Sequence, residues 1–180
     1  MLKKDYHFIL VILYFLLSFI ALEFAILGFV CLLYPVLTFY LKGSKKWCKT
    51  YCPRRSIFVN VISKLNIGLK APRSLVGLKA RKVVFNYFLI NLFIVLMSTF
   101  MVANGKMLPM LTTRFLIVFK LFEVNPMFHF TTNPAVLHLS YRLLSMILTT
   151  FIVGVGYSIM FKPRSWCAVC PITTIVSTKK

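Results

Sequence analysis

Acidic residues are nearly absent from this chain of 180 residues, which has only Asp5, Glu23 and Glu123 against 22 Lys and Arg. Charged residues of both signs make up 14% of the chain, whereas about a quarter is usual for a soluble domain. Hydrophobic residues make up 59%. A soluble globule of this size could not bury so many apolar side chains, and a disordered chain is poor in them. The composition therefore predicts an integral membrane protein that forms a single membrane domain over residues 1–180.

The formal net charge of +19 is compatible with nucleic-acid binding, with binding of anionic lipid, or with the cytoplasmic loops of a membrane protein. The basic residues lie mainly between and beyond long apolar runs. This distribution favours cytoplasmic loops and argues against a nucleic-acid partner. The lipid bilayer is thus the first partner that the sequence predicts.

The long apolar runs are Tyr6–Leu41, Val83–Ala103 and His138–Phe161. The first has 36 residues, which is too long for one span of about 20 residues. Both of its flanks are basic, and residues 42–82 after it contain twelve Lys or Arg and no acidic residue. Because basic flanks favour the cytoplasm, we expect a helical hairpin with its tip near residues 23–28. The alternative is one long tilted helix with Glu23 buried and a kink at Pro35.

The predicted fold class is all-α, a polytopic membrane helical bundle of about four transmembrane helices with short interfacial helices. The spans are expected at about 6–23, 26–41, 83–103 and 138–161. Both termini and the basic loop 42–82 then face the cytoplasm, and the loop 104–137 faces outward. We expect Ser56–Leu65 to form a short interfacial helix, and Leu108–Val124 to lie in the interface or re-enter the membrane. The first span lacks a signal-peptide cleavage pattern, so we expect it to be retained.

Four of the five cysteines form two close pairs within the similar segments WCKTYCP and WCAVCP. We call Cys48, Cys52, Cys167 and Cys170 the four motif cysteines. The predicted topology, which does not use the cysteines, puts both pairs at the same membrane face. Four thiols from two distant segments are therefore expected to converge on one site.

Pairs with this spacing allow one turn of chain to direct two sulfurs at one metal, and two pairs supply the four ligands of tetrahedral zinc or of a cubane iron–sulfur cluster. The Pro after each second Cys suits the first position of a helix, whose amides and dipole would then lie near the sulfurs. Three alternatives remain open. They are a disulfide, which is rare in the cytoplasm, structural zinc, and chance clustering of buried cysteines.

The segments WCKTYCPRRS and PRSWCAVCPITT resemble the paired motifs of small polytopic 4Fe-4S-binding membrane proteins. They are similar to the membrane part of the NapH and NosR type of electron-transfer proteins. The resemblance implies that the four motif cysteines bind a 4Fe-4S cluster, that the protein lies in a bacterial cell membrane, and that it transfers electrons. The chain lacks the soluble ferredoxin-like modules of larger relatives. It would therefore exchange electrons with a soluble donor or a redox partner subunit.

Other candidate residues are expected to have simpler roles. Cys31 lies within the second predicted span and is expected to be a packing residue. His7, His129 and His138 are potential haem ligands, but we expect interfacial or hydrogen-bonded histidines. Glu23 is either a proton-carrying carboxylate or a solvated residue of the hairpin tip.

The residues that flank the cysteine pairs also allow two interpretations. Trp47 and Trp166 could shield a cluster from water or anchor the chain at the interface. The basic neighbours could fix the topology, bind anionic lipid, offset the charge of a cluster or steer an acidic donor. They are Lys45, Lys46, Lys49, Arg54, Arg55, Lys162 and Arg164.

The sequence thus predicts a membrane electron-transfer protein with one iron–sulfur cluster at the cytoplasmic face, and not a stand-alone enzyme, since no nucleophile–base or carboxylate pair is evident. The alternatives are a membrane thiol–disulfide oxidoreductase and a scaffold subunit clamped by structural zinc.

Overall fold

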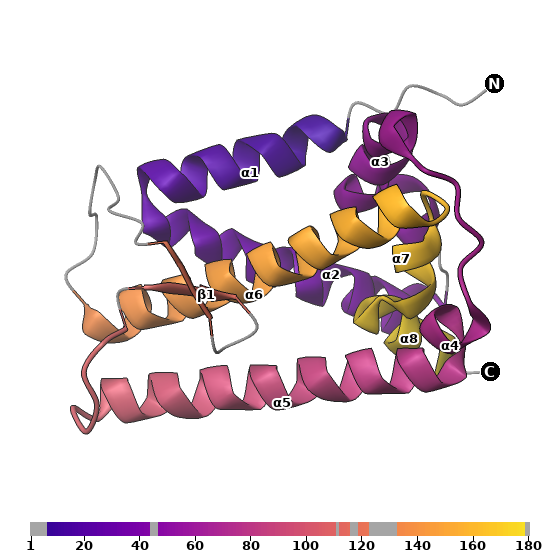
Figure 1. Ribbon diagram of the computed structural model, residues 1–180. Coiled ribbons are helices and arrows are strands. Elements are labelled where there is room, and N and C mark those ends of the chain that lie inside the picture. Colours follow the sequence, from indigo (N-terminus) through magenta and orange to yellow (C-terminus); the bar gives the residue numbers. More distant parts are fainter. Residues whose placement is uncertain (1–6, 44–46, 111, 116–118, 123–132, 179–180) are drawn as a thin grey trace. The chain divides into compact units, whose positions relative to one another are not determined.

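The computed structural model describes residues 7–43, 47–110, 112–115, 119–122 and 133–178, and the elements below lie within those ranges (Figure 1). The longer helices are α1 (Phe8–Ile20), α2 (Leu27–Lys42), α3 (Pro53–Asn60), α5 (Leu78–Ala103), α6 (Pro134–Met160) and α8 (Pro171–Thr178). The short helical turns are η1 (Leu22–Ile26), η2 (Trp47–Tyr51), η3 (Ile62–Leu65), α4 (Arg73–Val76) and α7 (Ser165–Val169). The predicted all-α class is confirmed.

Three helical segments are long and apolar enough to cross a membrane, namely Leu22–Leu41 with 20 residues, α5 with 26 and α6 with 27. The first arm of the predicted hairpin is shorter, because α1 has 13 residues. At 1.5 Å per residue, that helix spans about 20 Å of the roughly 30 Å hydrocarbon core of a bilayer. Of the about four transmembrane helices that we predicted, three are long enough to span, and the fourth, α1, is a shorter apolar helix.

The first apolar run divides into two helices, as predicted. Ala21 is extended, with φ −138° and ψ 119°, and ends α1. The chain then folds back, since the Tyr14 hydroxyl donates a hydrogen bond of 3.1 Å to the Ala25 carbonyl. A Cβ added at Gly28 would lie 2.7 Å from the Tyr14 hydroxyl oxygen. The single long helix is excluded, and the turn lies at residues 21–26, slightly before the predicted tip.

Two helices begin earlier than the hydropathy indicated. Helix α5 begins at Leu78, whereas hydropathy indicated Val83. The hydropathy of its first turns is low because they carry Lys79, Arg81 and Lys82. Such residues are compatible with the end of a membrane helix, since their long side chains can reach the membrane surface. Helix α6 begins at Pro134, and Asn133 Oδ1 accepts a hydrogen bond of 3.1 Å from the Ala135 amide. Proline at the first position and asparagine as cap are typical start signals.

A short hairpin follows α5, where the sequence predicted an interfacial or re-entrant segment. Strands β1 (Thr113–Phe115) and β2 (Phe119–Phe122) pair antiparallel, with Phe115 opposite Phe119. Thr and Phe favour strands, but three or four residues are too few for a periodic pattern to stand out. The strand pair was not predicted.

The chain divides into two compact units. Unit 1 comprises Met1–Ile12, Leu32–Phe88 and Phe151–Lys180, and its core contains Phe58, Ile62, Trp166 and Val169. Unit 2 comprises Leu13–Cys31 and Leu89–Thr150, and its core contains Leu22, Ala25, Tyr141 and Leu144. Figure 1 shows α3, α7 and the last turns of α6 close together within unit 1.

Candidate metal centre

The first cysteine motif is a wide helical turn followed by a helix. Helix η2 is a single π turn, in which the Cys52 amide donates a hydrogen bond of 3.0 Å to the Trp47 carbonyl five residues earlier. Cys52 is extended, with φ −64° and ψ 112°, and Pro53 begins α3. The Ser56 amide then donates to the Cys52 carbonyl at 3.2 Å.

The second motif has the same local architecture with a narrower turn. In α7, the Cys170 amide donates a hydrogen bond of 2.9 Å to the Trp166 carbonyl four residues earlier. Cys170 has φ −55° and ψ 131°, and Pro171 begins α8. The Thr174 amide then donates to the Cys170 carbonyl at 3.1 Å.

The two motifs differ by one residue between their cysteines, and the helical turn absorbs the difference. A π turn closes on the fifth residue and an α turn on the fourth. In each motif the amide of the second cysteine therefore donates a hydrogen bond to the carbonyl of the tryptophan, and that cysteine immediately precedes an eight-residue helix. The sequence similarity thus corresponds to a repeated local structure.

All four motif cysteines belong to unit 1, and Cys48, Cys52 and Cys170 lie within electrostatic range of the Cys167 thiol. Burial raises the pKa of the Cys167 thiol to about 12, and the neighbouring Cys170, Cys52 and Cys48 contribute to the rise, whereas Arg55 opposes it. Ionisation of Cys167 is therefore disfavoured beside the other three thiols, and a bound cation would offset that repulsion.

Burial also raises the pKa of Cys170, and groups that favour its thiolate surround it. The Thr173 amide donates a hydrogen bond to its sulfur, and Arg54 and the Ile172 amide also lower the pKa. The amides come from the first turn of α8, whereas Arg54 belongs to α3 in the other motif. The first turn of each motif's helix therefore faces the cysteines of the second motif.

The thiols are near one another but are not in ligand positions. Within the ranges that the structure describes, which include all four motif cysteines, no three Cys, His, Asp or Glu side chains are gathered closely enough to hold a metal ion. The same cysteines are not joined as disulfides. Donor type, cationic neighbours and helix amides fit an anionic thiolate-bound centre, and the sulfurs would have to close in to bind one.

An apolar core holds the motifs together. Phe58 of α3 packs with Trp166 and Val169 of α7, and the Phe58 ring stacks on Phe151 of α6 with centroids 6.1 Å apart. Trp166 is 4% exposed. Trp47 is instead half-buried against Tyr34, with ring centroids 4.6 Å apart. Hence only Trp166 is a core residue of the site, although the two tryptophans occupy equivalent places in the sequence motifs.

Two residues that sequence reasoning missed position the second motif. Arg81 Nε of α5 donates a hydrogen bond of 3.0 Å to the Ala168 carbonyl, between Cys167 and Cys170. Asn66 Nδ2 donates to the Ser158 carbonyl at 2.6 Å and to the Phe161 carbonyl, just before the motif. In the sequence Arg81 is only one of many basic residues that indicate topology, and nothing near Asn66 marks it.

The remaining candidates lie elsewhere. Cys31 belongs to unit 2, whereas the four motif cysteines belong to unit 1. His138 is fully buried there, where Nδ1 accepts a hydrogen bond of 2.9 Å from the Met110 amide and Nε2 lies 3.1 Å from Ser98 Oγ. With both nitrogens engaged, His138 is the hydrogen-bonded histidine that we expected. His7 packs edge-on against Tyr51.

The other predicted site residues are only partly described. Glu23 lies in η1, at the hairpin turn, and is half-buried. His129, Lys45 and Lys46 lie outside the described residues.

Comparisons of the chain with protein-family models, with curated proteins and with solved structures found no match.

Proposed function

We propose that this chain is a membrane electron-transfer protein that binds one 4Fe-4S cluster through the four motif cysteines. The observation that carries the proposal is the convergence of two matching motifs. About 115 residues separate Cys52 from Cys167 in the sequence, yet both motifs lie in one compact unit, and the thiols of the first motif contribute to the raised pKa of Cys167 in the second. The resemblance of both motifs to the NapH and NosR type supports the same assignment.

The surroundings of the thiols suit an anionic centre. A bound cluster would supply reversible one-electron transfer. The chain would supply four thiolate ligands, positive charge from Arg54 and Arg55, and amides of the first turn of α8 directed at the Cys170 sulfur. Trp166, almost completely buried beside Cys167, would exclude water. Hydrogen bonds and charge near the sulfurs are the features with which proteins set the potential of such clusters.

The thiol pKa values argue against the alternative of a thiol–disulfide oxidoreductase. A nucleophilic cysteine needs a lowered pKa, as at an exposed helix N-terminus or beside a cation. Here burial and neighbouring thiols raise the pKa of Cys167 to about 12, so the metal-free thiol is a poor nucleophile near neutral pH. A raised pKa is compatible with a ligand, because metal binding displaces the proton.

The charge distribution supports a cytoplasmic site. Unit 1 contains the start of α1, the end of α2, the start of α5 and the end of α6, together with the basic residues 42–82. Since Lys and Arg favour the cytoplasmic side, both termini and the centre would face the cytoplasm of a bacterial cell. Reporter fusions at Lys46, Gly105 and the C-terminus should read inside, outside and inside. Opposite locations for Lys46 and the C-terminus would remove the shared site.

The decisive experiment is metal analysis of anaerobically purified full-length protein in detergent. We expect broad absorbance near 400 nm that dithionite bleaches, with iron and acid-labile sulfide in equal amounts. Replacing any one motif cysteine by serine should lower both. The matched control is Cys31→Ser, which should lower neither because Cys31 lies within α2 and belongs to neither motif. Full iron content in Cys48→Ser or Cys167→Ser would exclude a shared cluster.

The same preparation separates the alternatives. Stoichiometric zinc without sulfide would identify a structural zinc clamp. Absence of both metals, with Cys167 and Cys170 cycling between dithiol and disulfide, would identify an oxidoreductase.

A further inference from the structure

The segment 64–82, which we call the strap, runs across the end of α6. Its backbone is fastened there by two hydrogen bonds, from the Ile67 amide to the Ile159 carbonyl at 2.9 Å and from the Leu69 amide to the Met160 carbonyl at 3.1 Å. The Asn66 side chain adds its bonds to the same turn. Because α6 is long and apolar enough to span a membrane, the strap lies where that span ends.

The strap exposes large apolar side chains. The exposed fractions are 68% for Leu65, 67% for Ile67, 50% for Leu69, 40% for Leu75 and 73% for Leu78. Soluble surfaces rarely present so many large apolar residues in so short a segment. Leu65, Ile67, Leu69 and Leu75 lie outside the candidate membrane spans, so the hydrocarbon core of the bilayer does not account for them, whereas Leu78 is the first residue of α5.

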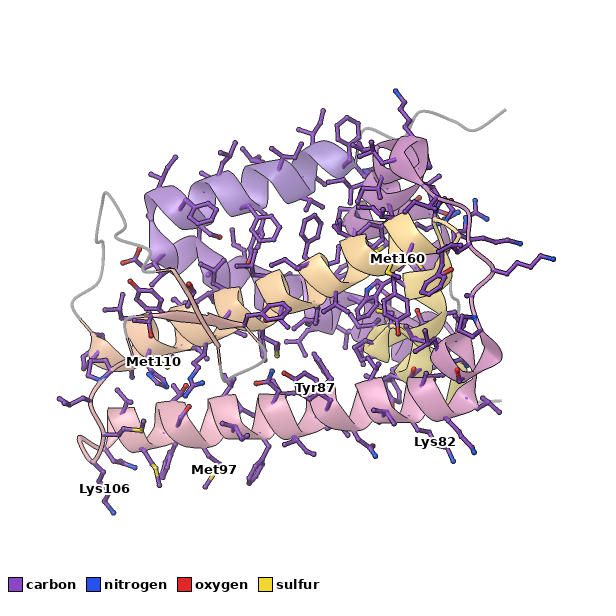
Figure 2. All side chains as sticks on the ribbon, in the orientation of Figure 1. Lys82, Tyr87, Met97, Lys106, Met110 and Met160 are labelled. Atoms are coloured by element: carbon purple, nitrogen blue, oxygen red, sulfur yellow. The ribbon has the colours of Figure 1, made fainter. Side chains whose placement is uncertain are left out.

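Exposed lysines are interleaved with these apolar residues. They are Lys64, Lys70, Lys79 and Lys82. Residues 42–82 contain no acidic residue, so the strap carries no internal counter-charge. Figure 2 shows the Lys82 side chain pointing outward from the beginning of α5. Apolar and cationic side chains thus share one exposed surface at the end of a span.

We propose that the strap is a binding surface for anionic phospholipid. The five apolar side chains insert at the boundary between headgroups and acyl chains, and the four lysines contact lipid phosphates. An acidic protein partner would match the charge, but it would also have to supply an apolar surface for the five side chains. Lipid satisfies both, since the fastening to α6 holds the strap at interfacial depth and basic residues gain about 1 kcal/mol each near an anionic membrane surface. The inference is independent of the metal centre.

The first test measures the preference for anionic lipid. Full-length Ile67→Trp protein in maltoside micelles is titrated with dioleoylphosphatidylglycerol or dioleoylphosphatidylcholine, and emission is compared with that of the parent protein, which contributes Trp47 and Trp166. We expect tighter binding of phosphatidylglycerol. Replacing the four strap lysines by glutamine should lower that preference about fivefold per lysine, which is 1 kcal/mol expressed as an affinity ratio.

The matched control removes the same charge elsewhere, by replacing Lys3, Lys4, Lys179 and Lys180 with glutamine. It should keep the preference within about twofold, because these four lysines do not belong to the strap. A preference that survives in the strap variant, or falls equally in the terminal variant, overturns the proposal.

The second test measures depth. In nanodiscs, the Ile67→Trp emission should be blue-shifted and quenched by lipids brominated near the top of the acyl chain. The variant Lys106→Trp, at an exposed position beyond the end of α5 in unit 2, gives the comparison for a hydrated site. Water-like, unquenched emission at position 67 would refute insertion into lipid. The lysines of the strap would then be assigned to binding of an acidic protein.

Discussion

Gly154→Ala should strain the core that holds the two cysteine motifs together. A Cβ at position 154 would lie 2.8 Å from Phe58 Cζ, 3.1 Å from Trp166 Cδ1 and 3.2 Å from Trp166 Cγ. Carbon atoms in contact prefer about 3.5–4.0 Å, so both rings must move. Phe58 and Trp166 are nearly fully buried, and their neighbours leave little freedom to move.

The magnitude follows from two opposing contributions. Overpacking a well-filled core costs about 1–3 kcal/mol. Alanine gains roughly 0.5–1 kcal/mol over glycine inside a helix. Gly156 is the matched control two residues along α6, because a Cβ there would meet nothing within 4 Å. The two alanine variants should therefore differ by about 1–3 kcal/mol, with Gly156→Ala the more stable.

The assay is thermal unfolding of the purified protein in one detergent, followed by tryptophan emission. For a chain of this length the difference corresponds to about 2–4 °C in Tm per kcal/mol. Phe58→Leu combined with Gly154→Ala should recover part of the loss, because it removes the closest atom, and a double-mutant cycle measures that coupling. Equal Tm values for Gly154→Ala and Gly156→Ala would refute the packing argument.

Four further predictions concern side chains of both units. Since the raised pKa of Cys167 is about 12, its thiol in metal-free protein should react with iodoacetamide at pH 7.5 roughly a thousandfold more slowly than an ordinary cysteine. The protonated thiol's contribution to folding stability is complete below an unfolded pKa of about 8.5 and lost as pH rises toward 12, so alkaline unfolding should set in above about pH 9 unless metal is bound. Arg81→Met should shift the reduction potential of a bound centre, because Arg81 Nε donates a hydrogen bond to the Ala168 carbonyl. Arg81→Lys should shift the potential less, because lysine keeps the positive charge. Equal potentials for the two variants in a voltammetric titration would contradict this. His138→Phe should lower the free energy of unfolding by about 1–3 kcal/mol, because the Met110 amide loses its acceptor. An unchanged Tm would contradict this.

Much of this protein is determined locally by the sequence. The scarcity of acidic residues and the long apolar runs predict a helical membrane protein, and three helices of spanning length fit that prediction. The basic flanks of residues 6–41 predict the break that Ala21 makes. The prolines after Cys52 and Cys170 predict the starts of α3 and α8, because proline lacks the amide that a first helical position does not need.

Tertiary structure alone decided which distant residues meet. The Asn66 bond to the Ser158 carbonyl joins residues 92 positions apart, and the Arg81 bond to Ala168 joins residues 87 apart. No local pattern encodes such partners, because each depends on how the core around Phe58 packs. The same packing buries Trp166 and leaves Trp47 half-buried, although both precede a cysteine. Local spacing thus specifies what each motif is, and long-range burial of apolar side chains specifies where its thiols lie.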